Sequence, residues 1–392
     1  MPEKAASRAR KIVNEGDILY STVRPYLHNM CIINREFSRE AIASTGFAVL
    51  KCCADYSNEF LFYYMMSPDF DSYANDTANS KGVAYPAIND ERLSMALVPI
   101  PPVSEQRRIL KQLLEILPTI QMYDITHQRL EKLNDTFPAQ LKKSILQDAV
   151  QGKLVLQDPA DEPASALLEH IRAEKEQLIK EGKIKRDKHE SVIFRRDNSY
   201  YEKVDGIERC IDDELPFEIP ESWEWCRLKS LTENITSGSR DWAKYYSTTG
   251  AAFLRMGNLS KNSFDLRLEH IQRVSIPSKA EGTRTSLQSG DLLFSITGDV
   301  GMLGLIPDGF EKAYINQHTA MIRFLPEMRN KYIPYLLLTD YAQKFYNVNQ
   351  HGIKNSFRLD SIGELLVSIP PEKELFRILQ RISLVLSKIA VL

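Results

Sequence analysis

The chain has 392 residues, 43% of them apolar and 26% charged, which is enough apolar material to bury more than one core. Its 50 basic residues stand against 52 acidic ones, so the net charge of −2 excludes a uniformly basic, histone-like binder of nucleic acid but leaves a local basic face open. No run reaches the roughly 18 apolar residues of a membrane span and no apolar signal segment opens the chain, which predicts a cytoplasmic protein.

An internal repeat is the most informative feature of the sequence, and its first copy begins near the N-terminus. The segments 16–21 and 290–295 both read Gly-Asp, three apolar residues and Ser, at an offset of 290 − 16 = 274. Each copy closes on Ile-Pro-Pro, at 100–102 and at 369–371. Between these points lie matching apolar runs, 48–50 with 320–322, and matching aromatic-rich segments, each predicted to be one amphipathic helix, 60–73 with 332–345. The pattern predicts one fold used twice.

After each Ile-Pro-Pro the apolar residues follow steps of four and three, the spacing of a coiled coil. The two stripes share one phase, because 378 − 109 and 369 − 100 both equal 269. Plain core packing produces the same spacing, but the length of the pattern and its duplication favour long helices whose stripes pack on each other. The stripes contain Ile109, Leu113, Ile116 and Ile120 in the first copy and Ile378, Ile382, Val385 and Ile389 in the second.

Proline and glycine predict how the middle of the chain is divided. We expect a kink of the first long helix near Pro118 and a break near Pro138. A short helix should then end at Gly152, and another, opened by Pro163, should run over 164–181. Residues 186–214 are charged and weakly apolar, which predicts a solvated connector. The predicted divisions are a partial first domain at 1–102, a helical spacer at 103–185, the connector at 186–214, a complete second domain at 215–371 and the start of a second coiled-coil helix at 372–392.

Motifs for catalysis or metal binding are missing from the sequence. It contains no Asn/Asp-Pro-Pro-aromatic loop of a base methyltransferase and no Gly-x-x-x-x-Gly-Lys-Ser/Thr phosphate loop. The five cysteines and seven histidines lack the spacings of metal ligands. Asp69 and Asp71 look like a nuclease pair, but their place in the repeat is a helix end, which favours a capping role. We therefore expect no cofactor, no metal and no enzymatic activity.

Several segments together resemble the specificity subunits of type I restriction-modification systems. They are 220–225 (Pro-Glu-Ser-Trp-Glu-Trp), 253–258 (Phe-Leu-Arg-Met-Gly-Asn), the Gly-Asp-Leu-Leu-Phe-Ser strand, the spacer region 144–168 and Ile-Pro-Pro before a coiled coil. The resemblance implies an α+β fold, with strand-rich target recognition domains separated by antiparallel coiled-coil helices. It also implies a noncatalytic subunit that binds double-stranded DNA, reads a split target, and directs methyltransferase subunits and a restriction, or translocase, subunit to it.

The chain departs from the family pattern at both ends. A counterpart of 217–278 is missing before residue 4, and the second stripe stops at Leu392. We therefore expect a first recognition domain that lacks its first half and leaves the apolar faces of 18–20 and 48–50 open. The alternative function is that of a shortened scaffold protein, which docks a methyltransferase or another specificity subunit without reading DNA itself.

Loops dense in polar and basic residues are the expected DNA-contacting surface, because Arg and Lys pair with guanine and Asn and Gln with adenine. For any single residue, a solvated loop side chain is at least as good an interpretation. The candidates in the second domain are Ser237, Arg240, Trp242, Lys244, Thr297, Asn316, Gln317, His318, Lys354, Asn355 and Arg358, and those in the first domain are Arg24, Thr45 and Lys81.

Overall fold

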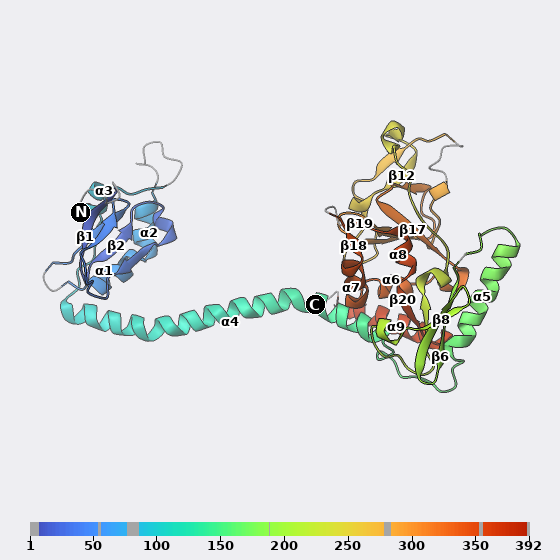
Figure 1. Ribbon diagram of the computed structural model, residues 1–392. Coiled ribbons are helices and arrows are strands. Elements are labelled where there is room, and N and C mark those ends of the chain that lie inside the picture. Colours follow the sequence, from blue (N-terminus) through green and yellow to red (C-terminus); the bar gives the residue numbers. More distant parts are fainter. Residues whose placement is uncertain are drawn as a thin grey trace. The chain divides into compact units, whose positions relative to one another are not determined.

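The computed structural model describes residues 8–53, 56–76, 86–187, 189–277, 284–352 and 356–389. It contains helices and strands throughout, which confirms the α+β class (Figure 1). Contacts divide the chain into two compact units, Met1–Lys132 and Leu133–Leu392, and the division falls inside one long helix, α4 (Val103–Val150). Within the described ranges, no helix is long and apolar enough to cross a membrane.

The first unit is built on a small antiparallel sheet in which β2 (Ile18–Ser21) lies between β3 (Met30–Ile32) and β5 (Phe47–Leu50). A separate antiparallel pair joins β1 (Ala9–Val13) to β4 (Ala41–Ser44). The remaining elements are the 3-10 helix η2 (Pro25–Leu27) and the helices α1 (Asn58–Met65), α2 (Pro68–Asn75) and α3 (Asp90–Ser94).

The expectation that the centre of this sheet is open is wrong. Ile18, Tyr20 and Ala48 are 0%, 2% and 4% exposed. Side chains alternate between the two faces of a strand, and the inward-facing residues of β2 and β5 meet side chains from the three helices of the same unit. The cluster around Tyr20 and Ala48 also contains Met65, Phe70, Ala74 and Leu93. The helices that follow β5 therefore close this core without a further strand.

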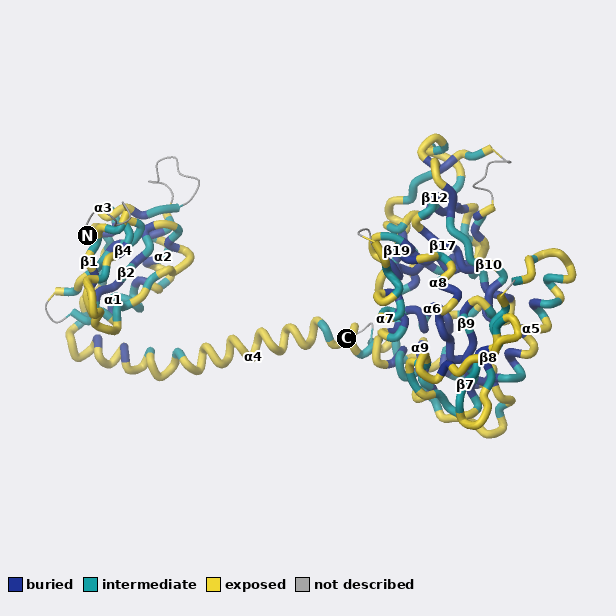
Figure 2. Tube along the Cα trace, viewed as in Figure 1, coloured by how far each residue is buried: buried dark blue, intermediate teal, exposed yellow. Residues whose placement is uncertain are grey.

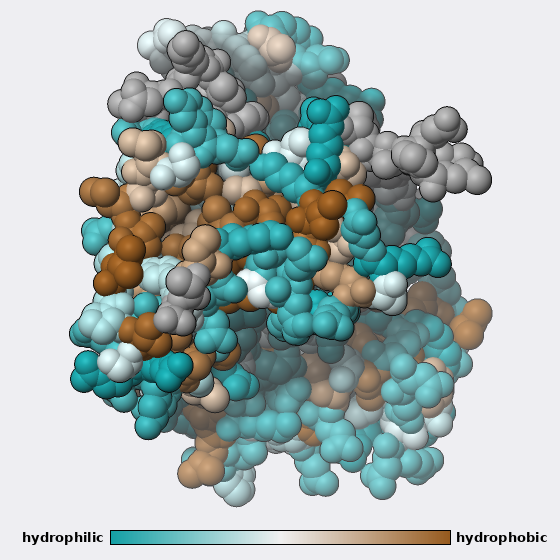
Figure 3. Space-filling view, turned by 90° about the vertical axis from the view of Figure 1, so that its left-hand side faces the viewer, coloured by the Kyte–Doolittle hydropathy of each residue, from teal (hydrophilic) through white to brown (hydrophobic). Residues whose placement is uncertain are grey.

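Apolar surface is exposed instead in the segment just before α4. Leu97 and Ile100 are 89% and 78% exposed, whereas their counterparts 269 residues later, Leu366 and Ile369, are 3% and 0% exposed. A strand accounts for the difference, because in the second unit these residues form β20 (Leu366–Ile369), which pairs with β9 (Glu224–Arg227). The surface drawn in Figure 3 carries brown apolar areas between hydrophilic ones.

The second unit contains two four-stranded sheets. The first has the order β10-β17-β14-β15 and the second the order β11-β13-β12-β16. The strands of the first sheet are β10 (Thr232–Ser237), β14 (Leu292–Ser295), β15 (Leu303–Leu305) and β17 (Thr319–Phe324). Those of the second sheet are β11 (Tyr246–Ser247), β12 (Ala251–Leu254), β13 (Gln272–Val274) and β16 (Ala313–Ile315). The helices α6 (Tyr332–Leu336), α7 (Asp340–Val348) and α8 (Leu359–Gly363) complete this part, with a hairpin of β18 (Gln350–His351) and β19 (Ser356–Phe357).

The predicted repeat is confirmed by strand topology. The order β3-β2-β5 in the first unit recurs as β15-β14-β17 in the second. The register agrees as well, since Tyr20 pairs with Ala48 as Phe294 pairs with Ala320. The turn before the central strand is also the same: the carboxylates of Asp17 and Asp291 each accept a 2.8 Å hydrogen bond from the backbone N–H three residues earlier.

The aromatic-rich segment of each copy forms two short helices and not the single helix that the pattern predicted. The break falls between α1 and α2 in the first unit and between α6 and α7 in the second. A hydroxyl cap explains it: the side chain of Ser67 accepts a hydrogen bond from Phe70 N, and that of Thr339 accepts one from Ala342 N. Such caps start a new helix, because they satisfy its first free N–H groups.

The expected break at Pro138 is wrong, because α4 runs without interruption from Val103 to Val150. A proline leaves the carbonyl four residues earlier without its helical partner. Those carbonyls belong to Leu114 and Asn134, which lie on exposed turns where water can take the place of the missing N–H. Figure 2 shows how much of α4 is exposed. The helix after it matches the prediction closely: α5 spans Ala164–Lys180.

The interpretation of 186–214 as a solvated connector is also wrong. This segment forms an antiparallel sheet of β6 (Ser191–Arg196), β7 (Ser199–Val204) and β8 (Ile207–Cys210). The side chain of Glu202, 3% exposed, anchors it. Burial alone would raise the pKa of Glu202, but hydrogen bonds from Arg227, Ser191 and Arg209 outweigh it and hold that pKa at about 2. Part of the charge that suggested solvation is thus paired around the buried Glu202, with Arg209 of the same segment and Arg227 of β9.

The last helix, α9 (Glu372–Ile389), packs within the second unit. Ile378 and Ile382 are both fully buried, in a cluster with Leu146, Ala149 and Val150 from the end of α4. Just before α9, the Ser368 hydroxyl donates a 2.7 Å hydrogen bond to the Val150 carbonyl, so the end of α4 meets the start of α9.

The two predicted stripes differ in burial. Ile109, Ile116 and Ile120 are 36%, 50% and 54% exposed. Since Ile378 and Ile382 already have packing partners, only the half-buried Val385 and Ile389 keep surface for another helix. The pairing of the two stripes stays a prediction.

Candidate nucleic-acid interface

Three polar loops lie together at one end of the sheet in the second unit. They follow β14, join β16 to β17, and form the β18–β19 hairpin. Backbone contacts hold them: Ile296 N donates to His318 O at 3.0 Å, Phe357 N donates to Ile296 O at 2.9 Å, and Thr297 forms a bridge with Ser356. These backbone groups determine how the loops present their side chains.

The first unit contains the same arrangement. Val23 forms a bridge with Ala87, and Ile88 N donates to Thr22 O at 2.9 Å. These are the repeat counterparts of the Thr297–Ser356 bridge and of the hydrogen bond from Phe357. Loops that the sequence analysis selected separately in the two halves are therefore equivalent positions of one fold.

His318 is at the centre of the loop cluster in the second unit. Its Nδ1 lies 2.8 Å from the hydroxyl of Thr297, and its Nε2 lies 2.9 Å from the side-chain amide nitrogen of Gln317. The carboxamide oxygen of Asn316 accepts hydrogen bonds from His318 N at 3.2 Å and from the Thr319 hydroxyl at 3.3 Å. The predicted site residues Thr297, Asn316, Gln317 and His318 are thus brought together in one hydrogen-bonded group.

Gly238 allows the chain after β10 to approach this group. A Cβ atom there would lie 2.5 Å from the carbonyl oxygen of Asn316 and closer still to that of Ile315. The neighbouring Ser239 forms a parallel bridge with Asn316. Only glycine fits here, because the obstructing atoms belong to the backbone and cannot rotate away. Ser237, which precedes it, is half-buried at the end of the strand.

The remaining candidates of the second unit differ in exposure. Arg240, Lys244 and Arg358 are exposed and can meet a partner, and the Lys244 ammonium lies 5.1 Å from the centre of the Tyr245 ring. The interpretation of Trp242 as a DNA contact is wrong: its side chain is 5% exposed and packs with Phe253, Val274 and Tyr314. Trp242 is surrounded by polar residues in the sequence, but the 3-10 turn at 242–245 points its indole into the core.

The candidates of the first unit lie on the equivalent loops. Arg24 adopts a left-handed conformation, with φ of 52°, and its N–H donates to Pro86 O at 2.9 Å. Thr45 is exposed and is the counterpart of Gln317. Three further candidates, Lys81, Lys354 and Asn355, lie outside the described residues.

The sequence analysis missed a cavity that adjoins the loop cluster. Its volume is about 590 Å³, and its lining joins the 255–258 turn and the 267–270 segment to the β16–β17 loop. The basic side chains in the lining are Arg255, Arg267, His270 and His318. The only sequence signal was the Phe-Leu-Arg-Met-Gly-Asn segment, which contributed to the family resemblance without drawing attention to its arginine.

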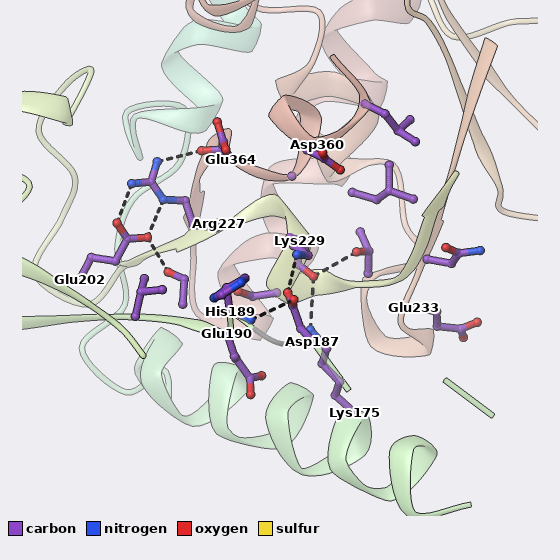
Figure 4. Close-up of a pocket in the computed structure, with 18 of the residues that line it drawn as sticks. Lys175, Asp187, His189, Glu190, Glu202, Arg227, Lys229, Glu233, Asp360 and Glu364 are labelled. Carbon is purple, nitrogen blue, oxygen red and sulfur yellow. Dashed lines mark hydrogen bonds and ion pairs between the residues drawn. The ribbon is translucent and has the colours of Figure 1, made fainter. Parts of the chain in front are cut away.

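A larger cavity of about 760 Å³ lies between α5, the β6–β8 sheet and β9 (Figure 4). Counting the described residues alone, its lining contains five Lys and Arg side chains against seven carboxylates. Most of the cations shown there already have partners: Arg227 binds Glu202, and Lys229 binds Asp187 at 2.6 Å. An excess of carboxylates repels phosphate, so the loop cluster is the better candidate for nucleic acid.

The sequence is similar to known proteins over parts of its length. Residues 5–135 match the family described as type I restriction modification DNA specificity domain. The chain is 31% identical over 289 residues to the type I restriction enzyme EcoAI specificity subunit of Escherichia coli, covering 62% of this chain and 45% of that protein. It is 30% identical over 241 residues to the EcoEI specificity subunit of the same species, covering 59% and 37%. The chain thus spans less than half the length of either relative.

Solved structures show the same fold. The crystal structure of the HsdS subunit from Thermoanaerobacter tengcongensis aligns with a TM-score of 0.51 at 20% identity, covering 100% of this chain and 78% of that one. A structure from a study of assembly and conformational transition of the type I R-M system aligns with a TM-score of 0.50 at 20% identity, covering 100% and 79%. The sequence comparisons agree with one another: residues 5–135 match the type I restriction modification DNA specificity domain, and the chain is similar to the specificity subunits of type I restriction enzymes.

Proposed function

We propose that this chain is a noncatalytic DNA-recognition subunit that binds double-stranded DNA in a sequence-specific manner. One observation carries the proposal: both units hold equivalent polar loops at the same end of the same sheet, tied by equivalent backbone hydrogen bonds. A duplicated reading surface suits a target made of two separated parts. It also explains a net charge near zero, because recognition through a few loops needs only local basic side chains.

Each class of loop side chain has a role in this proposal. The exposed Arg240, Lys244 and Arg358 contact phosphates and position the unit on the duplex. Gln317 reads a base edge in the major groove, where a carboxamide can pair with adenine through two hydrogen bonds. Asn316, whose carboxamide oxygen already accepts two hydrogen bonds, donates to a base edge through its amide nitrogen. Bonds to Thr297 and Gln317 hold the ring of His318 within this surface.

The helices supply the contact with partner subunits. Apolar side chains of α4 at 116, 120, 123, 130 and 137 are at least 50% exposed. A row of exposed apolar side chains on one helix is typical of a surface that binds another protein. We propose that this surface docks the methyltransferase subunits, through which the restriction subunit joins, and that it also receives the second stripe if the two stripes pair. A complex that acts on DNA in this way works in the cytoplasm.

Binding to randomised duplex DNA tests the function. Replacing Arg240, Lys244 and Arg358 together by alanine should weaken binding and flatten its dependence on salt, by about 0.9 log-log unit for each phosphate that the variant no longer neutralises. A matched control replaces Arg195, Lys203 and Arg381, which carry the same charges elsewhere on the second unit. Equal affinity and slope for both triple variants would refute the placement of the surface.

The scaffold alternative is separated by the wild-type chain itself. If it selects no sequence from the random pool but still co-purifies with a methyltransferase subunit of its own system, it is a docking protein and not a reader. Methylation of random-sequence duplexes by that complex gives a second readout. Methylation at one recurring sequence supports recognition by this chain, and complex formation without sequence preference contradicts it.

A further inference from the structure

The 255–258 turn lines the cavity beside the loop cluster and has no role in the proposed function so far. β12 ends at Leu254, and the chain then turns through the 3-10 helix η7 (Met256–Asn258). Arg255 stands at this turn, and Asn316 and His318 line the same cavity. An arginine therefore faces the same space as two of the side chains proposed to meet DNA.

The turn is held in place from inside the fold. Asn258 is 4% exposed, and its carboxamide oxygen accepts a 3.0 Å hydrogen bond from Arg255 N. Its amide nitrogen donates a 2.9 Å hydrogen bond to the carbonyl oxygen of Arg267. One buried amide thus joins the backbones of both arginines. A group whose backbone is fixed loses less entropy when it binds a ligand.

The same turn is joined to the loop after β14. A Cβ atom at Gly298 would be 3.5 Å from the terminal methyl of Met256, so the loop rests on the turn. Ser260 also forms an antiparallel bridge with Leu303 in β15. The position of Arg255 relative to Thr297 and His318 is therefore determined by packing.

Charge distinguishes Arg255 from the structural arginines of this unit. Arg323 binds Asp291 at 2.7 Å, and Arg377 binds Asp161 at 2.6 Å. Arg255 is exposed and, within the described ranges, forms no ion pair with a carboxylate. Among the described residues of the lining, Glu269 is the one carboxylate, against the basic side chains of Arg255, Arg267, His270 and His318. The guanidinium of Arg255 thus keeps its donors available for a ligand.

We infer that Arg255 is a specificity-determining residue that reads a guanine in the DNA duplex. The inference rests on the proposed function and names one contact within it. A guanidinium presents two parallel N–H donors, which match O6 and N7 of guanine in the major groove. The guanidinium extends from the cavity into the groove, and Asn316, which also lines the cavity, meets the neighbouring base.

Selection from a pool of duplexes with a randomised core tests this inference. The wild-type chain should select a sequence that contains a guanine which Arg255→Ala no longer prefers. On the wild-type sequence, Arg255→Ala should bind roughly 5- to 150-fold more weakly, the range for one bidentate base contact, with an unchanged salt slope. Arg381→Ala, which removes an exposed arginine on α9, should leave affinity and preference unchanged.

A second variant keeps the test independent of folding. Arg255→Gln should change the preference at that position from guanine towards adenine, because glutamine pairs with N6 and N7 of adenine. Loss of structure cannot create a new preference. An unchanged selected sequence with uniformly weaker binding and a flatter salt slope would identify a phosphate contact and overturn the inference. Unchanged affinity and preference in both variants would also overturn it. Failure of the wild-type chain to bind duplex DNA would instead refute the proposed function.

Discussion

Replacing Gly238 by alanine should damage sequence reading more than it damages the fold. The added Cβ would lie 2.5 Å from the carbonyl oxygen of Asn316 and closer to that of Ile315, whereas real Cβ atoms stay at 3.0 Å or beyond. The two segments must therefore separate by more than 0.5 Å. Both obstructing atoms are backbone atoms, so the shift moves the loop that carries Asn316, Gln317 and His318.

The size of the effect follows from the tolerance of hydrogen bonds. Overpacking of this kind costs about 1–3 kcal/mol of stability, which a unit of this size survives. A shift of half an ångström takes a hydrogen bond out of its preferred distance range. If Gln317 makes one bidentate hydrogen-bonded pair with a base, removing that pair lowers affinity for the selected duplex about 5- to 150-fold. Affinity for other sequences, which depends on phosphate contacts, should change much less.

The ratio of affinities for the selected and an unrelated duplex is the measurement. Partial unfolding lowers both affinities equally, so only displacement of the reading loop changes their ratio. Gly309→Ala is the control, because Gly309 lies outside the cavity lining, its φ of 70° disfavours alanine, and a Cβ there would meet nothing within 4 Å, so the variant loses stability without moving the reading loop. A Gly238→Ala protein with the wild-type ratio would refute the placement of the reading loop.

Three further predictions concern stability. Glu202→Gln should remove a pH dependence of the unfolding free energy. The wild-type carboxylate has a pKa of about 2 in the fold against 4.5 unfolded, so it contributes about 3 kcal/mol of stability above pH 4.5, which is lost as the pH falls to 2. In urea titrations between pH 4.5 and pH 2, the unfolding free energy should therefore fall more steeply in the wild type than in the variant. Trp242→Ala should lower the unfolding free energy by about 3–5 kcal/mol in urea titrations, while a change below 1 kcal/mol would contradict its place in the core. Gly152→Ala should lower the melting temperature more than Gly182→Ala does. Both glycines have φ of 72°, but only at Gly152 would a Cβ lie 2.5 Å from the Pro220 side chain. Equal melting temperatures of the two variants would count against this contact.

Much of the fold could be predicted from the sequence because it depends on local patterns. The two copies of the Gly-Asp strand were found from their spacing, and the register of Tyr20 with Ala48 and of Phe294 with Ala320 agrees with it. The helix after Pro163 and the turn at Gly152 followed from short-range conformational preferences. The polar loops were found from composition, because sheets expose their connecting loops.

Tertiary structure decided what each side chain faces. The sequence placed Trp242 with the polar residues around it, but only packing against Phe253 shows that it is core. The composition of 186–214 is charged, which indicated a connector, but in the fold Glu202 pairs with Arg227 and the segment forms a sheet. Arg255 lay in a recognised segment, but only the fold places it in the lining of one cavity with Asn316. Local patterns specify strands and helices through neighbours in the chain, whereas burial and ion pairing depend on residues distant in sequence that meet only when the sheets pack.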